Sequence, residues 1–140
     1  MTPISAVLVI AGFALAAPQA NTPFPHGPLR NSFASAAESV IDTADAVEIQ
    51  APEVRYAPEM QQLHATYDRL KSLAEDDRET NVARALNDLL FAISACHLQA
   101  TGGGPTDKCE AQVQRARIRS MEAMDKHRTA GGWVDGPPVE

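Results

Sequence analysis

The stretch VARALNDLLFAISACHLQATGGGPTDKC, residues 82–109, decides how this chain folds. Its first part places large apolar side chains three or four positions apart, which is the spacing of one helical face. Three consecutive glycines and a proline then end the helix, because glycine accepts a left-handed backbone and proline cannot continue a helix. The apolar face consists of Val82, Leu86, Leu89, Leu90, Ile93 and Cys96. We therefore predict a helix over 82–100, a turn, and a second helix over 106–129.

The two cysteines of the chain lie on either side of this turn. Cys96 precedes the end of the first helix by about one turn, and Cys109 lies in the first turn of the next. An antiparallel hairpin brings these positions level, so the Cα atoms can approach the roughly 5.5 Å that a disulfide prefers. A redox-active pair is the alternative, but such pairs usually have the form Cys-x-x-Cys. We expect a structural Cys96–Cys109 disulfide.

Two further helices are predicted before the hairpin. The first is capped by Asn31 or Ser32 and runs until Pro52, because the residue before a proline is pushed out of the α region. Residues 51–57 are predicted to form a linker, and Pro58 to open the next helix, where a missing N–H costs little. The apolar faces consist of Phe33, Ala37, Val40, Ile41, Ala44 and Val47 in one helix, and of Met60, Leu63, Tyr67, Leu70 and Ala74 in the other.

The polar residues 75–81 leave it open whether 58–100 is one long helix or two. Asp76, followed three residues later by Glu79, has the pattern of a new helix start. Without glycine or proline, the same residues could form the solvated middle of one helix. We favour a break, and so expect an all-α fold: a small up-down bundle of three or four helices with one disulfide-linked helical hairpin.

The first thirty residues are predicted to lie outside the bundle. No charged side chain precedes Arg30, and residues 4–17 form an apolar run of about 14, shorter than the roughly 20 residues of a membrane span. We divide the chain into a signal peptide (1–16), a disordered proline-rich arm (17–30), a helical bundle domain (31–130) and a C-terminal tail (131–140). Trp133 in the tail either hangs free or is pinned into a groove. The mature protein is expected to be secreted and extracellular, without a stable membrane span.

Charge is distributed unevenly along this chain of net charge -6. Residues 31–59 hold six acidic residues and one basic residue, whereas 107–128 hold six basic and four acidic residues. The two segments are either separate faces for partners or two helices that attract each other, and we favour the second interpretation. We expect no binding to nucleic acid, because the helix turns Arg117 away from Arg115 and Arg119 and aromatic residues for base stacking are absent there.

Two sets of residues contain the side chains that a metal site or a catalytic site would need. Met60, His64 and His97 would gather at one end of an up-down bundle and could ligate haem or a metal. Ser94, Ser120, His97 and His127 contain the groups of a nucleophilic site, but no nucleophile-elbow turn surrounds them. Core methionine, boundary histidines and ordinary serines explain both sets. We expect no catalytic residue, no cofactor and no metal ligand.

These observations favour a non-enzymatic interaction protein. Export, small size and the lack of catalytic motifs indicate a secreted helical protein, effector-like or surface-associated, that binds a macromolecular partner. That partner is an unknown extracellular protein or surface. The first alternative is a carrier of a small apolar ligand or a protein that binds hydrophobic surfaces, and the second is a haem or metal-binding bundle.

Overall fold

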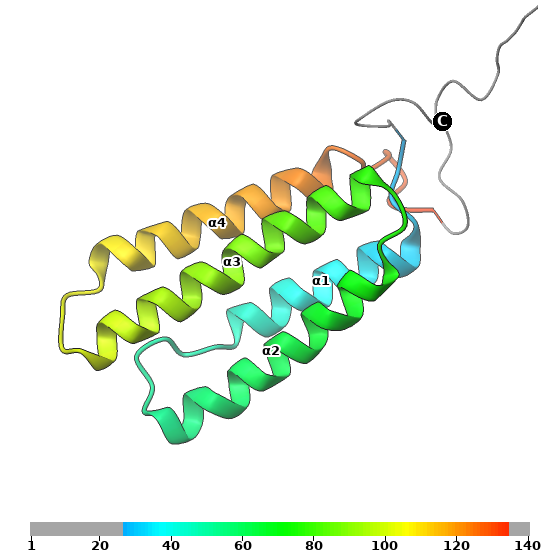
Figure 1. Cartoon of the computed structure of the whole chain (residues 1–140). Coiled ribbons are helices and arrows are strands. Elements are labelled where there is room, and N and C mark those ends of the chain that lie inside the picture. Colours follow the sequence, from blue (N-terminus) through cyan, green and yellow to red (C-terminus); the bar gives the residue numbers. More distant parts are fainter. Residues whose placement is uncertain (1–26, 135–140) are drawn as a thin grey trace, which may run out of the picture.

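Four helices make up most of residues 27–134, which are the residues that the computed structural model describes. They are α1 (Asn31–Asp45), α2 (Glu53–Leu73), α3 (Asp77–Thr101) and α4 (Asp107–Asp125). Successive helices run in opposite directions (Figure 1). The predicted all-α up-down bundle is confirmed, with four helices. The predicted leader, the arm up to residue 26 and the tail beyond residue 134 lie outside the described residues.

The helices share one core, but they do not pack equally against one another. The closest pairs are α3 with α4 and α1 with α2, and α3 also contacts both α1 and α2. The seam between α1 and α4 is looser than any of these contacts. The large apolar side chains that α2 and α3 contribute to the core are Tyr56, Met60, Leu63, Tyr67, Leu70, Val82, Leu86, Leu89, Leu90 and Ile93. The predicted apolar faces of these helices are therefore the buried ones.

The Cys96–Cys109 disulfide joins the end of α3 to the start of α4, as predicted. The Cα atoms of the two cysteines are 5.2 Å apart. The chain reverses between them through the triple glycine, where Gly103 has a φ of 81°. A side chain at that φ would be strained, so the turn depends on glycine there.

The break between α2 and α3 falls at 74–76, which excludes a single long helix. Asp76 is the N-cap of α3, and its carboxylate accepts a hydrogen bond of 3.0 Å from the backbone N–H of Glu79. The carboxylate of Glu79 accepts in return from the N–H of Glu75, at 2.9 Å. The capping pattern in the sequence is thus used almost as it stands. Most of the polar stretch belongs to the first turn of α3.

Helix α1 ends at Asp45, earlier than the prediction that it runs until Pro52. The backbone after it is held by partners elsewhere in the bundle instead of by helical hydrogen bonds. The N–H of Glu48 donates to the Glu59 carboxylate at 3.0 Å. The carbonyl of Ile49 accepts from a ring nitrogen of His97 at 2.7 Å. These contacts offer the polar backbone groups an alternative to a continued helix.

Helix α2 begins at Glu53, five residues before the proline predicted to open it. Pro52 is the N-cap, and its carbonyl accepts from the N–H groups of Arg55 and Tyr56 at 2.9 Å each. Pro58 lies in the second turn, where it removes one helical hydrogen bond. The extra turn buries Tyr56, which is 7% exposed. Burial of this side chain offsets the local cost of the proline. Residues 53–57 are therefore helical, and the prediction that they belong to a linker is wrong.

Within residues 27–134, none of the helices combines the length and the apolar character that crossing a bilayer requires.

Candidate binding groove

A groove opens along the loose seam between α1 and α4. Its volume is about 250 Å³, and it runs to the turn that follows α4. The residues that line it are Glu38, Ile41, Asp42, Arg117, Met121, Met124, Asp125, Arg128 and Trp133. Two of the four methionines and the single tryptophan of the chain therefore meet in one place.

The floor of the groove is apolar. Ile41 and Met124 are buried, at 5% and 4% exposed, whereas Met121 is 40% exposed at the mouth. The loose seam leaves Met121 facing solvent. Methionine is flexible and polarisable, so such a floor can adapt to differently shaped apolar groups.

Trp133 is pinned against this groove, which decides between the two alternatives left open for the tail. Its indole Nε1 donates to the carboxylate of Glu38 at 3.3 Å, and the guanidinium of Arg128 lies 5.6 Å from the ring centroid. The next residue, Val134, donates its N–H to the carbonyl of Leu29 at 3.3 Å. Residues 133–134 are thus held by α1, by the turn after α4 and by the segment before α1.

The rim of the groove carries three acidic side chains, Glu38, Asp42 and Asp125, and two basic ones, Arg117 and Arg128. Arg117 is neutralised by Asp45, with two hydrogen bonds of 2.7 and 2.8 Å, and this pairing raises the pKa of Arg117. Among residues 27–134, no salt bridge engages the carboxylates of Asp42 and Asp125. The Arg117–Asp45 pair also supports the interpretation that the acidic and basic segments attract each other.

Beyond the Arg117–Asp45 bridge, the seam continues as a second hollow. It lies between the loop after α1 and the first half of α4. Gln50 closes its far end, donating to Thr106 at 3.0 Å and to Glu110 at 2.9 Å. The two hollows therefore form one interrupted groove along most of α4. The residues that line the second hollow are Val47, Ile49, Gln50, Glu110, Ala111, Val113 and Gln114.

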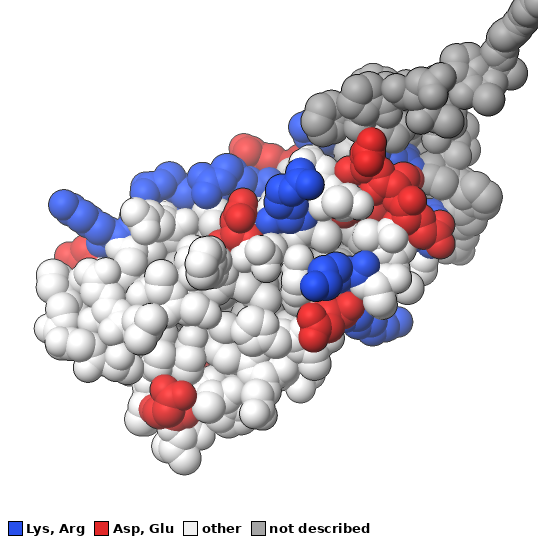
Figure 2. Space-filling model, viewed as in Figure 1, with Lys and Arg blue, Asp and Glu red and all other residues white. Residues whose placement is uncertain are grey.

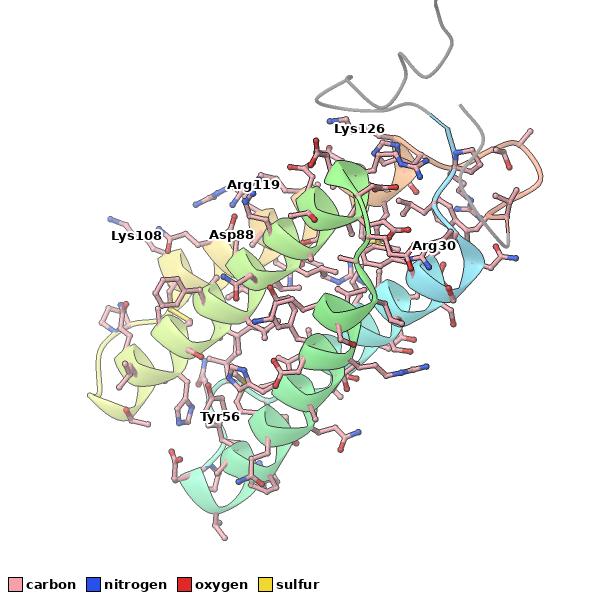
Figure 3. All side chains as sticks on the ribbon, turned by 45° about the vertical axis from the view of Figure 1, so that its right-hand side comes forward. Arg30, Tyr56, Asp88, Lys108, Arg119 and Lys126 are labelled. Carbon is pink, nitrogen blue, oxygen red and sulfur yellow. A yellow bond between two sulfur atoms is a disulfide. The ribbon has the colours of Figure 1, made fainter. Side chains whose placement is uncertain are left out.

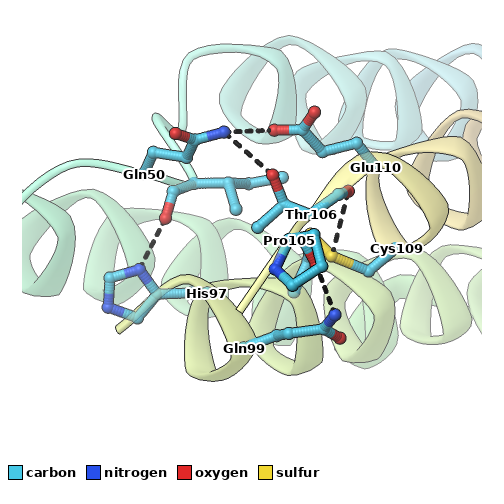
Figure 4. The surroundings of a disulfide bond; sticks show 9 residues. Gln50, His97, Gln99, Pro105, Thr106, Cys109 and Glu110 are labelled. Carbon is cyan, nitrogen blue, oxygen red and sulfur yellow. Dashed lines mark hydrogen bonds between the residues drawn. A yellow bond between two sulfur atoms is a disulfide. The ribbon is translucent and has the colours of Figure 1, made fainter. Parts of the chain in front are cut away.

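His97 lies beside the disulfide and stabilises the fold through its contacts (Figure 4). Its Nδ1 donates to the carbonyl of Ile49 at 2.7 Å, and its Nε2 lies 3.1 Å from the carboxylate of Glu53. Its ring stacks on Tyr56 with centroids 3.4 Å apart. Both ring nitrogens are thus occupied, and the ring fixes the loop after α1 to α3.

The structure does not assemble the residues considered for metal binding. Met60 is buried at 6% exposed and His64 is exposed, while His97 bonds to Ile49 and Glu53. Across the described part of the chain, no three histidine, cysteine or acidic side chains gather in a way that could hold an ion.

The residues considered for nucleophilic catalysis have other partners in the structure. The Ser120 hydroxyl is buried and donates to the carbonyl of Ala116 at 2.9 Å. Burial raises the pKa of Tyr56, and Ser94 acts in the opposite direction without cancelling this effect. His127 lies at the opposite end of the bundle from His97, after the end of α4.

A buried ionic cluster was missed by the sequence analysis. Glu79 is fully buried and accepts two hydrogen bonds from Arg30, at 2.8 and 2.6 Å, which raise the pKa of Arg30. Arg78, 1% exposed, donates to the carbonyl of Pro28 at 2.7 Å and to Asp76 at 2.8 Å. The capping pattern was the one signal of this cluster in the sequence. It pointed to a helix start and not to burial.

Comparison of the chain with protein-family models, with curated proteins and with solved structures found no match.

Proposed function

We propose that this protein is a secreted, non-enzymatic binding protein that holds a basic amphipathic helix of a partner protein in the α1/α4 groove. The observation that carries the proposal is the apolar lining of Ile41, Met121 and Met124 beside the carboxylates of Asp42 and Asp125. A helix with apolar residues on one face fills such a groove, and methionine-rich floors are common in helix-binding proteins. Basic residues on its flanks would face Asp42 and Asp125.

The shape of the groove favours a helix over a small ligand. The seam continues past the Arg117–Asp45 bridge, so that it follows α4 from about residue 110 to the end of the helix at Asp125. At 1.5 Å per residue this is roughly 23 Å, which a helical peptide of about 18 residues would span.

Secretion is part of the proposal and is supported by the disulfide, since such bonds persist mainly in oxidising compartments. N-terminal sequencing of protein recovered from the medium of the producing cells tests it. We expect the mature chain to begin at Ala17. An intact N-terminus on protein retained inside the cell would contradict the export step.

Trp133 provides the binding test, because it is the only tryptophan and lines the groove. The probes are two synthetic helical peptides of about 18 residues, one of leucine and lysine and one of leucine and glutamate. We expect the basic peptide to shift the tryptophan emission in a saturable way and the acidic peptide to leave it unchanged.

A matched pair of variants on α4 separates groove binding from general charge attraction. Met121→Lys adds a positive charge inside the groove, whereas Ile118→Lys adds it on the exposed side of the same helix, where residue 118 is 51% exposed. We expect M121K to weaken binding of the basic peptide by about tenfold or more, and I118K to change it little. Equal effects of both variants would refute the groove as the binding site. An apolar dye that binds in a Met121-dependent manner, without peptide binding, would favour the carrier alternative.

A further inference from the structure

The outer face of α3 carries an apolar stripe that no described residue covers. Phe91 and Leu98 are 76% and 71% exposed, and the exposed Ala95 lies between them. The spacing of four and then three residues places all three on one side of the helix. No charged residue occurs between Asp88 and Asp107. Figure 2 shows the corresponding uncharged field at the end of the molecule formed by the turn between α3 and α4.

A row of basic side chains runs along α4 beside this field. Lys108, Arg115, Arg119 and Lys126 follow one another at intervals of seven, four and seven residues, so they lie on one side of the helix. All four are exposed, and within residues 27–134 none forms a salt bridge. Figure 3 shows Lys108, Arg119 and Lys126 along one edge, away from Tyr56 and Arg30. We call these four residues the basic row.

The disulfide sets the apolar stripe and the basic row in register. Because Cys96 is opposite Cys109 and the two helices are antiparallel, Leu98 is level with Lys108, and Phe91 is level with Arg115. The two faces are continuous: Asp88 of α3 and Arg119 of α4 line the same shallow hollow between the helices. Each large apolar side chain therefore has a cation at its own height.

We propose that this α3/α4 face docks on an anionic lipid surface. Phe91 and Leu98 would enter the headgroup region, and the basic row would contact the lipid phosphates, the arrangement that interfacial helices use. The stripe protrudes and is not sunk in a pocket, so a deformable lipid layer fits it without a preformed partner cavity. The positive row contrasts with the net charge of -6, so this face suits an anionic layer better than the average surface of the molecule does. This site lies outside the α1/α4 groove and does not depend on it.

Flotation with vesicles tests the proposal, using phosphatidylcholine alone and phosphatidylcholine mixed with phosphatidylglycerol. The full mature chain is expected to float with the mixed vesicles at low salt, to be released as salt rises, and to bind pure phosphatidylcholine weakly. We expect F91S/L98S and R115Q/R119Q each to weaken binding about tenfold or more. The control is Val54→Ser, a change of an 84% exposed apolar residue on α2 that should leave binding unchanged.

Three outcomes would overturn the proposal: no flotation with the anionic vesicles at low salt, equal binding to both vesicle types, or equal weakening by V54S. Binding of the leucine–glutamate peptide through Phe91 and Arg115, without vesicle binding, would assign the face to an acidic protein and also overturn it. Because all the substituted residues are exposed, circular dichroism should confirm an unchanged fold for every variant.

Discussion

At the scale of single residues, the Arg30–Glu79 pair is the contact that most firmly joins the start of α1 to the start of α3. Glu79 has no exposed surface, whereas the Arg30 side chain is 13% exposed. Arg30 also donates to the carbonyl of Leu73 at 2.6 Å, which satisfies the end of α2. One guanidinium thus holds three helices at the same end of the bundle.

Removing the charge of Glu79 should destabilise the protein strongly. Glu79→Gln leaves Arg30 with only the exposed carboxylate of Glu75, 3.4 Å away, and losing one partner of a buried pair typically costs about 3 kcal/mol. Urea unfolding followed by circular dichroism measures this change. The control is Glu48→Gln, which breaks the exposed Glu48–Arg55 pair and should cost under about 0.5 kcal/mol. Similar losses in both variants would contradict the special position of Glu79.

His127 should make stability depend on pH. Burial lowers its pKa below the ordinary 6.5, the charge of Arg78 lowers it further, and Lys126 acts in the same direction. The backbone of Gly27 and the charge of Asp76 oppose this shift without cancelling it. The unfolded chain therefore binds a proton at a higher pH than the folded chain does, and the stabilisation is lost as pH falls from about 6.5 through the lowered pKa.

We expect the free energy of unfolding to fall over that pH range in the native sequence and to fall less steeply in His127→Gln. Denaturant titrations at successive pH values provide the measurement. His64→Gln, which alters an exposed histidine, serves as the control and should retain the native slope. A flat profile in the native protein would show that His127 is not protonated differently in the two states.

At the scale of elements, the α3–α4 hairpin is the most tightly connected unit of the bundle. Its helices form the closest pair, and the disulfide holds them in register. The two neighbours of α4 pack against it differently. Helix α3 packs closely, whereas a groove remains between α1 and α4. The many alanines among the buried residues of α1, namely Ala34, Ala36, Ala37 and Ala44, bring it close to α2 and α3 but leave little side chain to reach α4.

Loss of the disulfide should lower stability without abolishing the helices. The bond closes a loop with a sequence separation of 13 residues, which in the chain-entropy model contributes about 3 kcal/mol. The double variant C96A/C109A should therefore unfold at lower urea concentration, with nearly unchanged helical content. Reduction of the native protein should produce the same shift. Reduction without any effect would show that packing alone holds the hairpin.

At the scale of the whole molecule, the two ends of the described chain are joined to each other. The N–H of Val134 donates to the carbonyl of Leu29, and the N–H of Asn31 donates to the carbonyl of Val134. Leu29 is fully buried and belongs to the core, so the bundle extends two residues before its first helix. This short pairing places Trp133 over the α1/α4 seam, where α1 and α4 otherwise make little contact.

Replacing Trp133 should weaken the contact that covers the α1/α4 seam. We expect Trp133→Ala to lower the free energy of unfolding by about 1–2 kcal/mol, less than the loss for a fully buried aromatic residue, because the indole is only partly covered. Thermal unfolding followed by circular dichroism measures the change. Ile118→Ala, at an exposed position on α4, should have little effect. Unchanged stability in W133A would mean that the tail does not help to close the seam.

The sequence by itself determined the features that depend on near neighbours in the chain. Helical periodicity identified the buried faces of α2 and α3, and the glycine run with its flanking cysteines predicted the hairpin and its disulfide. The cap at Asp76 was predicted for the same reason, since its partner is three residues away. These interactions are local, so composition and spacing alone identify them.

Only the tertiary structure decided where distant groups meet. Glu79 is buried because Arg30 reaches it from 49 residues away, and the loop after α1 is fixed because His97 binds Ile49 across 48 residues. The groove exists because α1 and α4 face each other without packing closely, which no pattern within either helix expresses. The fold class follows from local periodicity, whereas the candidate site depends on gaps and pairings between elements that are adjacent only in space.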